Sequence, residues 1–280
     1  MKKTIFITGC STGIGYYTLT TLHAKGYQVV GSCRQTEDVA KIEQMGIPCL
    51  QLDLADSHSI QQAVKALLEL TQGKIDVLFN NGAFGLPGAV EDLSRDALRY
   101  QFETNVFGTQ ELTNLLVPVM RTNGGGKIIY NSSILGFAAM AYRGAYNASK
   151  FAIEGLADTL RLEVKHDNIY ISLIEPGPIL SEFRANSFRQ YQRWIAGTPS
   201  AHQANYDSMI ARLEKEGAAA PFTLGPEAVC DRVEWILKAN KPKARYPVTF
   251  PTYLFAWLKR FLPSRWLDYL LIQAGGNGKR

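Results

Sequence analysis

Long hydrophobic runs are absent from this sequence. No stretch reaches the roughly 18 consecutive apolar residues that suggest a membrane-spanning helix, so we predict no transmembrane segment. The first ten residues are charged and then apolar, as in a signal peptide. Their apolar part is short and leads directly into a glycine loop. We therefore predict a buried first strand here.

Cysteine and histidine are scarce, with four of each. The cysteines have no C-x-x-C spacing and the histidines are not clustered, so we predict neither a zinc site nor a disulfide framework, and expect no metal. Such cysteine usage fits a reducing compartment, and the expected location is cytoplasmic.

Runs of one charge are also lacking. The net charge of +5 is dispersed and forms no basic stripe, which argues against nucleic-acid binding. The balance of 46% hydrophobic and 20% charged residues is that of a globular protein. We expect one catalytic domain over residues 1–250 and an amphipathic extension over residues 251–280.

The N-terminal region has the pattern of a dinucleotide-binding βαβ unit. The predicted order is a strand over 4–8, a glycine loop over 9–15, a helix over 16–25 and a strand over 28–32. Gly9, Gly13 and Gly15 would let backbone N–H groups approach a pyrophosphate, which would lie at the N-terminus of the helix.

A second pattern lies at Tyr146 and Lys150, which are four residues apart at the start of a predicted helix over 148–162. This spacing puts both side chains on one helix face. An ammonium beside a phenol should lower the pKa of the phenol from about 10 and make it a general acid/base. Ser133 could offer a hydroxyl to the same reacting oxygen if the chain folds back. The spacing alone is also compatible with an exposed helix face.

The two patterns together resemble the short-chain dehydrogenase/reductase family, which combines Gly-x-x-x-Gly-x-Gly with Tyr-x-x-x-Lys. Further landmarks of the family follow the predicted strands in order: Asp53 after strand 49–52, Asn80-Asn81-Gly82-Ala83 after 76–79, Asn105 in the next helix, Asn131-Ser132-Ser133 after 127–130, and Pro176-Gly177 after 170–174. The resemblance covers residues 4–181. It implies an α/β Rossmann fold, with a doubly wound, seven-stranded parallel sheet whose last strand lies near 244–248. It also implies a helical substrate lid over 181–221.

The chain departs from the family pattern at two places. Asn-Asn-Gly-Ala stands where the family usually has Asn-Asn-Ala-Gly, and Ser181 stands where threonine is frequent. The first change keeps two small residues, and the second keeps a hydroxyl for the nicotinamide carboxamide. We expect neither change to abolish function.

The resemblance also implies residue roles. The implied catalytic residues are Asn105, Ser133, Tyr146 and Lys150, with Asn105 holding a water in a proton relay. The implied cofactor-binding residues are Gly9, Ser11, Thr12, Gly13, Ile14, Gly15, Arg34, Asp53, Leu54, Asn81, Gly82, Ala83, Tyr146, Lys150, Pro176, Gly177, Ile179 and Ser181. Asp53 would contact the adenine, whereas Asp56 better fits the role of a helix cap.

The end of the second predicted strand indicates the cofactor. NAD-preferring members of the family carry an acidic residue there, whereas this sequence has Cys33 followed by Arg34. A guanidinium can pair with a 2′-phosphate, and no carboxylate repels it. NADP(H) is therefore favoured, although Arg34 could simply be a solvated loop residue.

The predicted activity is NADPH-linked reduction of an apolar aldehyde or ketone, which is reversible. Phe84, Phe137, Tyr142 and Leu180 are the candidate substrate contacts. Overall, the chain resembles bacterial NADP-dependent aldehyde reductases of the family, which are related to its 17β-hydroxysteroid and retinol dehydrogenase branch. This favours medium-chain, aromatic or retinal-like carbonyls and a homo-dimer or homo-tetramer. A hydroxysteroid or retinol dehydrogenase and a non-catalytic NADP-sensing protein remain as alternatives.

The segment 253–272 is rich in aromatic and aliphatic residues, interleaved with Lys259, Arg260 and Arg265 and divided by Pro263. We expect two short helices that pack on the domain or across a subunit contact. Peripheral contact with a membrane is the less favoured alternative.

Overall fold

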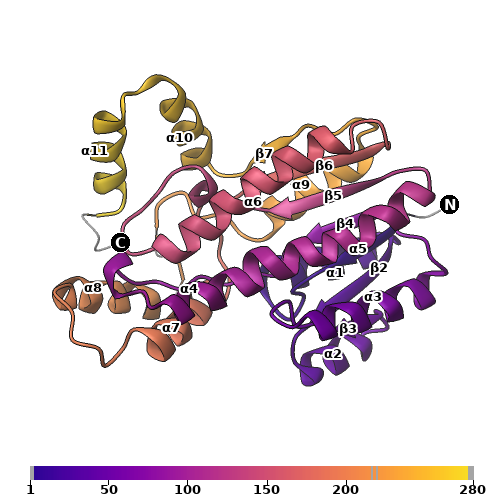
Figure 1. The fold of residues 1–280 in the computed structure, drawn as a ribbon, viewed down its shortest axis with the longest axis horizontal. Coiled ribbons are helices and arrows are strands. Elements are labelled where there is room, and N and C mark those ends of the chain that lie inside the picture. Colours follow the sequence, from indigo (N-terminus) through magenta and orange to yellow (C-terminus); the bar gives the residue numbers. More distant parts are fainter. Residues whose placement is uncertain (1–2, 216, 219, 277–280) are drawn as a thin grey trace.

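A parallel sheet lies at the centre of the computed structural model, which describes residues 3–215, 217–218 and 220–276 (Figure 1). Within these residues its seven strands are β1 (Thr4–Ile7), β2 (Gln28–Cys33), β3 (Cys49–Gln51), β4 (Val77–Asn80), β5 (Gly126–Asn131), β6 (Ile169–Glu175) and β7 (Arg245–Pro247). Their spatial order is β3-β2-β1-β4-β5-β6-β7, so the winding reverses between β1 and β4. The predicted doubly wound α/β fold is confirmed.

Hydrophobic cores lie on both faces of the sheet. Successive side chains of a strand point to opposite faces, and Phe6 and Leu78 accordingly belong to one core whereas Ile7 and Phe79 belong to the other. All residues of β1 and β4 are buried. This explains why three consecutive residues in each strand are apolar instead of alternating with polar ones.

Helices cover both of these cores. The core on one face includes residues of α3 (Ser57–Thr71), α5 (Thr109–Thr122) and α6 (Gly144–Glu163), and the core on the other includes residues of α1 (Gly13–Ala24), α2 (Thr36–Glu43) and α9 (Glu227–Lys238). The Asp56 carboxylate accepts a hydrogen bond of 2.9 Å from the backbone N–H of His58. Asp56 therefore caps α3, as the sequence predicted.

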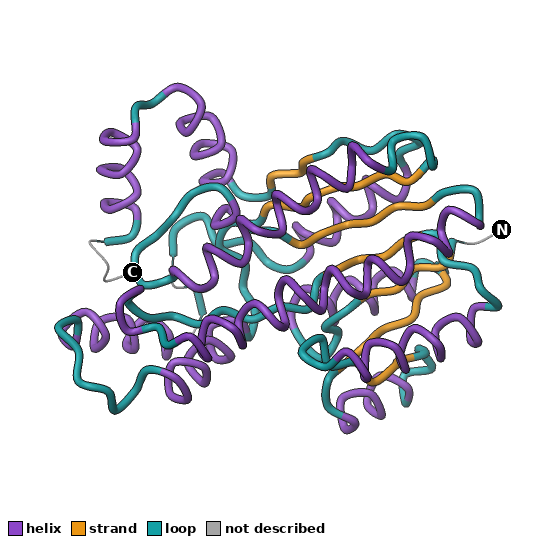
Figure 2. The backbone as a smooth tube through the Cα atoms, viewed as in Figure 1, coloured by secondary structure: helices purple, strands orange, loops and turns teal. Residues whose placement is uncertain are grey.

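Two further helix pairs lie beyond the carboxyl ends of the strands, at the left of Figure 1. The first pair, α7 (Phe183–Trp194) and α8 (Gln203–Glu214), occupies the predicted lid region. The second pair is α10 (Phe250–Phe261) and α11 (Ser264–Ala274), which are divided at Pro263 as predicted. Figure 2 shows this second pair projecting from the rest of the backbone.

The C-terminal pair packs on the domain through one face. Phe255 of α10 and Leu271 of α11 are buried in a cluster with Ile134, Leu135 and Ala138. Those three residues directly follow the Ser133 position of the sequence motif. The expected packing of the tail on the domain is therefore found, and it lies against the segment that carries a candidate catalytic residue.

Candidate active site

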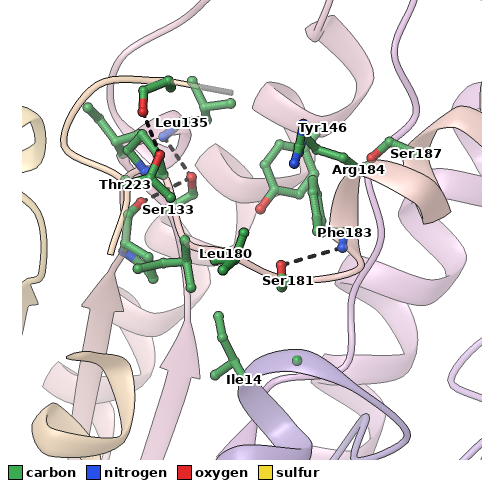
Figure 3. A pocket seen from close by; sticks show the side chains of 18 of the residues that line it. Ile14, Ser133, Leu135, Tyr146, Leu180, Ser181, Phe183, Arg184, Ser187 and Thr223 are labelled. Atoms are coloured by element: carbon green, nitrogen blue, oxygen red, sulfur yellow. Dashed lines mark hydrogen bonds between the residues drawn. The ribbon is translucent and has the colours of Figure 1, made fainter. Parts of the chain in front are cut away.

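One cavity of about 670 Å³ connects most of the sequence motifs. Its lining begins at the glycine loop after β1 and includes the turns after β4, β5 and β6. It ends among residues of the lid and of α10, and Figure 3 shows part of its wall. Open α/β sheets bind ligands at this edge, next to the reversal of strand order.

The glycine loop packs too tightly for larger residues. Gly9 has φ +71°, and a Cβ atom there would lie 2.8 Å from the Cα of Gly82. A Cβ at Gly15 would lie 2.2 Å from the Gly9 carbonyl oxygen. These clashes require glycine at both positions, because neither neighbouring atom belongs to a flexible side chain.

The N-terminus of α1 faces the cavity, and its lining there is Ser11, Thr12, Gly13 and Ile14. In the described structure, Thr12 precedes the helix without capping it through its side chain. The first N–H groups of a helix have no partner within the helix and favour an anion. The loop therefore fits the pyrophosphate of a dinucleotide.

Ser133 and Tyr146 meet at the cavity. Ser133 follows β5, and its side-chain oxygen accepts a hydrogen bond of 3.1 Å from the backbone N–H of Leu135. Tyr146 lies in the first turn of α6, with its ring centroid 5.3 Å from that of Phe183. In Figure 3 its hydroxyl points into the cavity. The Ser133 hydroxyl opposes the rise in the Tyr146 pKa that burial causes, because it favours the phenolate.

Lys150 lies one helical turn after Tyr146 and is buried. Its ammonium donates a hydrogen bond of 2.7 Å to the Asn131 carbonyl and lies 5.6 Å from the centroid of the Tyr146 ring. The structure thus brings together the serine, tyrosine and lysine of the sequence pattern.

The expected lowering of the Tyr146 pKa by Lys150 is wrong. Burial raises the pKa of Tyr146 above its ordinary value, and only Ser133 and Arg143 offset the rise. The Lys150 ammonium faces the tyrosine ring and the Asn131 carbonyl, and burial lowers its own pKa to about 8 while Glu154 opposes that change. Desolvation disfavours the charged form of both side chains.

Asn105 occupies a π-helical segment, η2 (Glu103–Gly108), where the sequence predicted an ordinary helix. Its side-chain oxygen accepts a hydrogen bond from the backbone N–H of Phe84, and its amide donates to the Phe84 carbonyl and to the Ser149 hydroxyl. Asn105 therefore joins the turn after β4 to the residue before Lys150. Its role in a proton relay stays a prediction.

Most of the predicted cofactor residues line the cavity. Besides the residues named above, they include Asn81, Gly82, Ala83, Pro176, Gly177, Ile179 and Ser181. Gly15, Arg34, Asp53 and Leu54 lie outside the described lining. The Asp53 carboxylate accepts a hydrogen bond of 2.9 Å from the backbone N–H of Ala55 in the turn before α3.

The predicted substrate contacts lie partly at the cavity and partly beside it, and their roles stay predictions. Leu180 lines the cavity, whereas Phe84, Phe137 and Tyr142 are not part of its described lining. Phe84 stacks on Tyr100 within the core under the lid, and the Tyr142 hydroxyl is turned toward α8 and its preceding residue. Phe137 packs in the cluster beneath the C-terminal helices. Each of these side chains is taken up by packing or hydrogen bonding elsewhere.

Other aromatic and aliphatic residues form the apolar wall of the cavity. Phe183 comes from the lid, Phe222 from the segment after it, and Phe250 and Leu254 from α10. Phe222 and Phe250 stack with centroids 5.1 Å apart. No local spacing in the sequence connects these residues, because the chain brings them together only through tertiary structure.

An ionic cluster lies next to the segment that carries the candidate catalytic residue Ser133. Arg245 of β7 approaches Glu154 at 2.9 Å, Asp158 at 2.7 Å and Glu175 at 3.1 Å, and Glu154 accepts a hydrogen bond from the Ser132 hydroxyl. Burial and the nearby Glu154 raise the pKa of Glu175 to about 7, against the opposing effect of Arg245. The cluster ties β6, β7 and α6 to the residue that precedes Ser133.

Comparison with known proteins decides the family. The family model described as short chain dehydrogenase matches residues 3–192. The chain belongs to the short-chain dehydrogenase/reductase family. It is 40% identical to the uncharacterized oxidoreductase YbbO of Escherichia coli over 97% of this chain and 94% of YbbO.

Two further similar proteins add to this comparison. The chain is 33% identical to the 3-ketodihydrosphingosine reductase of Bacteroides thetaiotaomicron, over 95% of this chain and 96% of that protein. A short-chain dehydrogenase from Streptomyces avermitilis has a similar fold, with a TM-score of 0.76, 24% identity and full coverage of both chains. The site therefore belongs to an oxidoreductase fold that binds a nicotinamide dinucleotide.

Proposed function

We propose that this protein is an NADP(H)-dependent reductase of aldehydes or ketones with apolar substituents. The observation that carries the proposal is the position of Ser133, Tyr146 and Lys150 in one cavity that joins the glycine loop to an apolar wall. The similarity to a protein named as a reductase of a keto compound supports it.

The chain's own residues donate the proton and stabilise the charges that develop as it is transferred. Bound in the cavity, the nicotinamide cofactor supplies the hydride that reaches the carbonyl carbon. The raised pKa of Tyr146 keeps its hydroxyl protonated and ready to donate to the carbonyl oxygen. Ser133 donates a hydrogen bond to that oxygen while negative charge develops on it. Ser133 and Arg143 favour the phenolate that remains after proton transfer, because both oppose the rise in the Tyr146 pKa.

The preference for NADP(H) rests on the end of β2. Cys33 is buried there, and the exposed Arg34 follows it, so no carboxylate stands at this position. The backbone carbonyl of Arg34 accepts a hydrogen bond of 3.3 Å from the Gln51 side chain. This contact fixes the backbone and leaves the guanidinium available for a 2′-phosphate.

Replacing Arg34 by aspartate is expected to change the preference from NADPH to NADH. The variant loses a charged hydrogen bond of about 1.5–3 kcal/mol and gains repulsion against the 2′-phosphate. The measurement is kcat/KM with each cofactor, with Arg34→Gln as a control that removes the cation without adding an anion. An Arg34→Asp variant that prefers NADPH as strongly as wild type would contradict the assignment.

A spectrophotometric panel tests the reaction itself. With NADPH, we expect turnover of medium-chain and aromatic aldehydes or retinal, and little turnover of sugar carbonyls, because the cavity wall is apolar. Oxidation of hydroxysteroids or retinol with NADP⁺ as the dominant activity would favour the alternative dehydrogenase. NADPH binding without turnover of any compound would favour the sensor.

A further inference from the structure

The two C-terminal helices carry a second apolar face that the domain does not cover. We define this aromatic face by its eight exposed side chains: Phe250, Tyr253, Leu254, Trp257, Phe261, Trp266, Tyr269 and Ile272. Exposed fractions reach 59% for Trp257 and 65% for Trp266. Spacings of three and four residues place the members of each helix along one side.

Packing within the chain does not account for this face. The residues of α10 and α11 that contact the domain, Phe255 and Leu271 among them, occupy other positions of the same helices. A helix at the surface of a soluble domain normally presents polar residues outward, whereas here both sides are apolar. The intramolecular packing favoured by the sequence explains only one of them.

The composition of the aromatic face matches the interface of a bilayer. Two tryptophans and two tyrosines are among its eight side chains, and these residue types concentrate at the level of lipid headgroups.

The charges beside the aromatic face are mostly positive. Lys259, Arg260 and Arg265 are exposed, and Asp268 is the acidic residue on the same two helices. The Lys259 ammonium donates to the Phe137 carbonyl and holds α10 on the domain. In the described structure neither arginine forms an ion pair. A two-fold contact with a second copy would bring this positive charge against itself, whereas anionic headgroups would neutralise it.

The aromatic face is continuous with the cavity. Phe250 and Leu254 belong to both, and the exposed Phe222 stacks on Phe250 at the cavity wall. Figure 1 shows α10 and α11 at the same end of the molecule as the lid helices. A surface bound by this face would therefore lie beside the cavity.

We propose that α10 and α11 dock the protein, through the aromatic face, on a bilayer that contains anionic lipids. No helix within the described residues is long and apolar enough to cross a membrane, so the contact is interfacial. It combines burial of aromatic side chains with attraction between arginine and headgroups. This proposal goes beyond the proposed function. Binding to the bilayer does not require catalysis, so it can be measured whether or not the protein reduces carbonyl compounds.

Vesicle flotation with the full chain tests the docking. The protein is expected to float with vesicles of equimolar phosphatidylcholine and phosphatidylglycerol, and much less with vesicles of phosphatidylcholine alone. Added salt should weaken the binding, because exposed charges are screened. A protein that stays at the bottom of the gradient with the anionic vesicles would overturn the proposal.

Two pairs of variants separate the aromatic and cationic contributions. Trp257→Ser with Trp266→Ser should lower partitioning to both kinds of vesicle at least about tenfold. Arg260→Glu with Arg265→Glu should lower it by a similar factor on anionic vesicles only. The matched controls are Trp235→Ser and Lys65→Glu with Lys74→Glu, which alter exposed side chains of α9, α3 and the turn after α3.

Circular dichroism confirms that each variant is folded. Unchanged flotation of the double tryptophan variant would overturn the proposal. Light scattering adds a further outcome that overturns it. If wild type is an oligomer and the same variant is a monomer, a second copy covers the aromatic face.

Discussion

Replacing Tyr146 with phenylalanine is expected to lower kcat for carbonyl reduction by about 10²–10⁴-fold, the usual contribution of a positioned general acid. The change removes one oxygen atom and keeps the ring that packs on Phe183 and lies under the Lys150 ammonium. NADPH affinity and the melting temperature should therefore change little. Steady-state kinetics and a fluorescence titration with NADPH measure the two effects separately.

Tyr142→Phe provides a matched control. Its hydroxyl also belongs to a tyrosine near the start of α6, but it forms hydrogen bonds with His202 and Asn205. We expect this variant to keep most of the wild-type kcat. If Tyr146→Phe retains more than about a tenth of wild-type turnover, Tyr146 is not the proton donor.

Replacing Arg245 with leucine is expected to destabilise the fold by about 2–4 kcal/mol, somewhat below the usual cost of breaking a buried ion pair because Arg245 is partly exposed. The variant leaves the carboxylates of Glu154 and Glu175 buried without their shared cation. Denaturant unfolding measures the loss. Arg121→Leu, which removes a surface partner of Asp167, should cost only about 0–1 kcal/mol.

The stability loss caused by Arg245→Leu should depend on pH, and the pKa of Glu175 gives the direction of that dependence. The pKa of Glu175 is about 7 in the folded protein and about 4.3 when unfolded, so the folded state binds more protons between these values. The stability from this group is complete below the unfolded pKa and is lost as pH rises through the folded pKa. Without Arg245 the folded pKa rises further.

The deficit of Arg245→Leu should therefore be larger at about pH 8 than at about pH 5.5. Adding Glu175→Gln to the variant should restore part of the stability at the higher pH, because no charge is then buried at that position. A deficit that is the same at both pH values would show that lost packing, not charge, is responsible.

The fold could be predicted from the sequence because its signals are local. Most strands of the sheet contain a short apolar run. Several motif residues lie at or just after the end of such a run, so the order of the motifs already indicates one edge of a parallel sheet. The need for glycine at positions 9 and 15 is also a local signal, because close packing at a βα turn appears in the sequence as a pattern of glycines.

The wall of the cavity could not be predicted, for the opposite reason. Phe183, Phe222 and Phe250 are far apart in sequence, and nothing in their spacing shows that they meet. The direction of the Tyr146 pKa depends on how much water the fold excludes, which a Tyr-x-x-x-Lys pattern does not specify. The π-helical turn at Asn105 likewise depends on its bonds to Phe84 and Ser149.

Because the C-terminal helices contact the segment after Ser133, they cannot be replaced independently of the rest of the domain. Phe255 and Leu271 share a buried cluster with Ile134, Leu135 and Ala138. Exchanging α10 and α11 for those of another enzyme would therefore alter the packing next to the candidate catalytic residue Ser133 along with the surface. A working chimaera would have to carry both halves of this contact from the same parent.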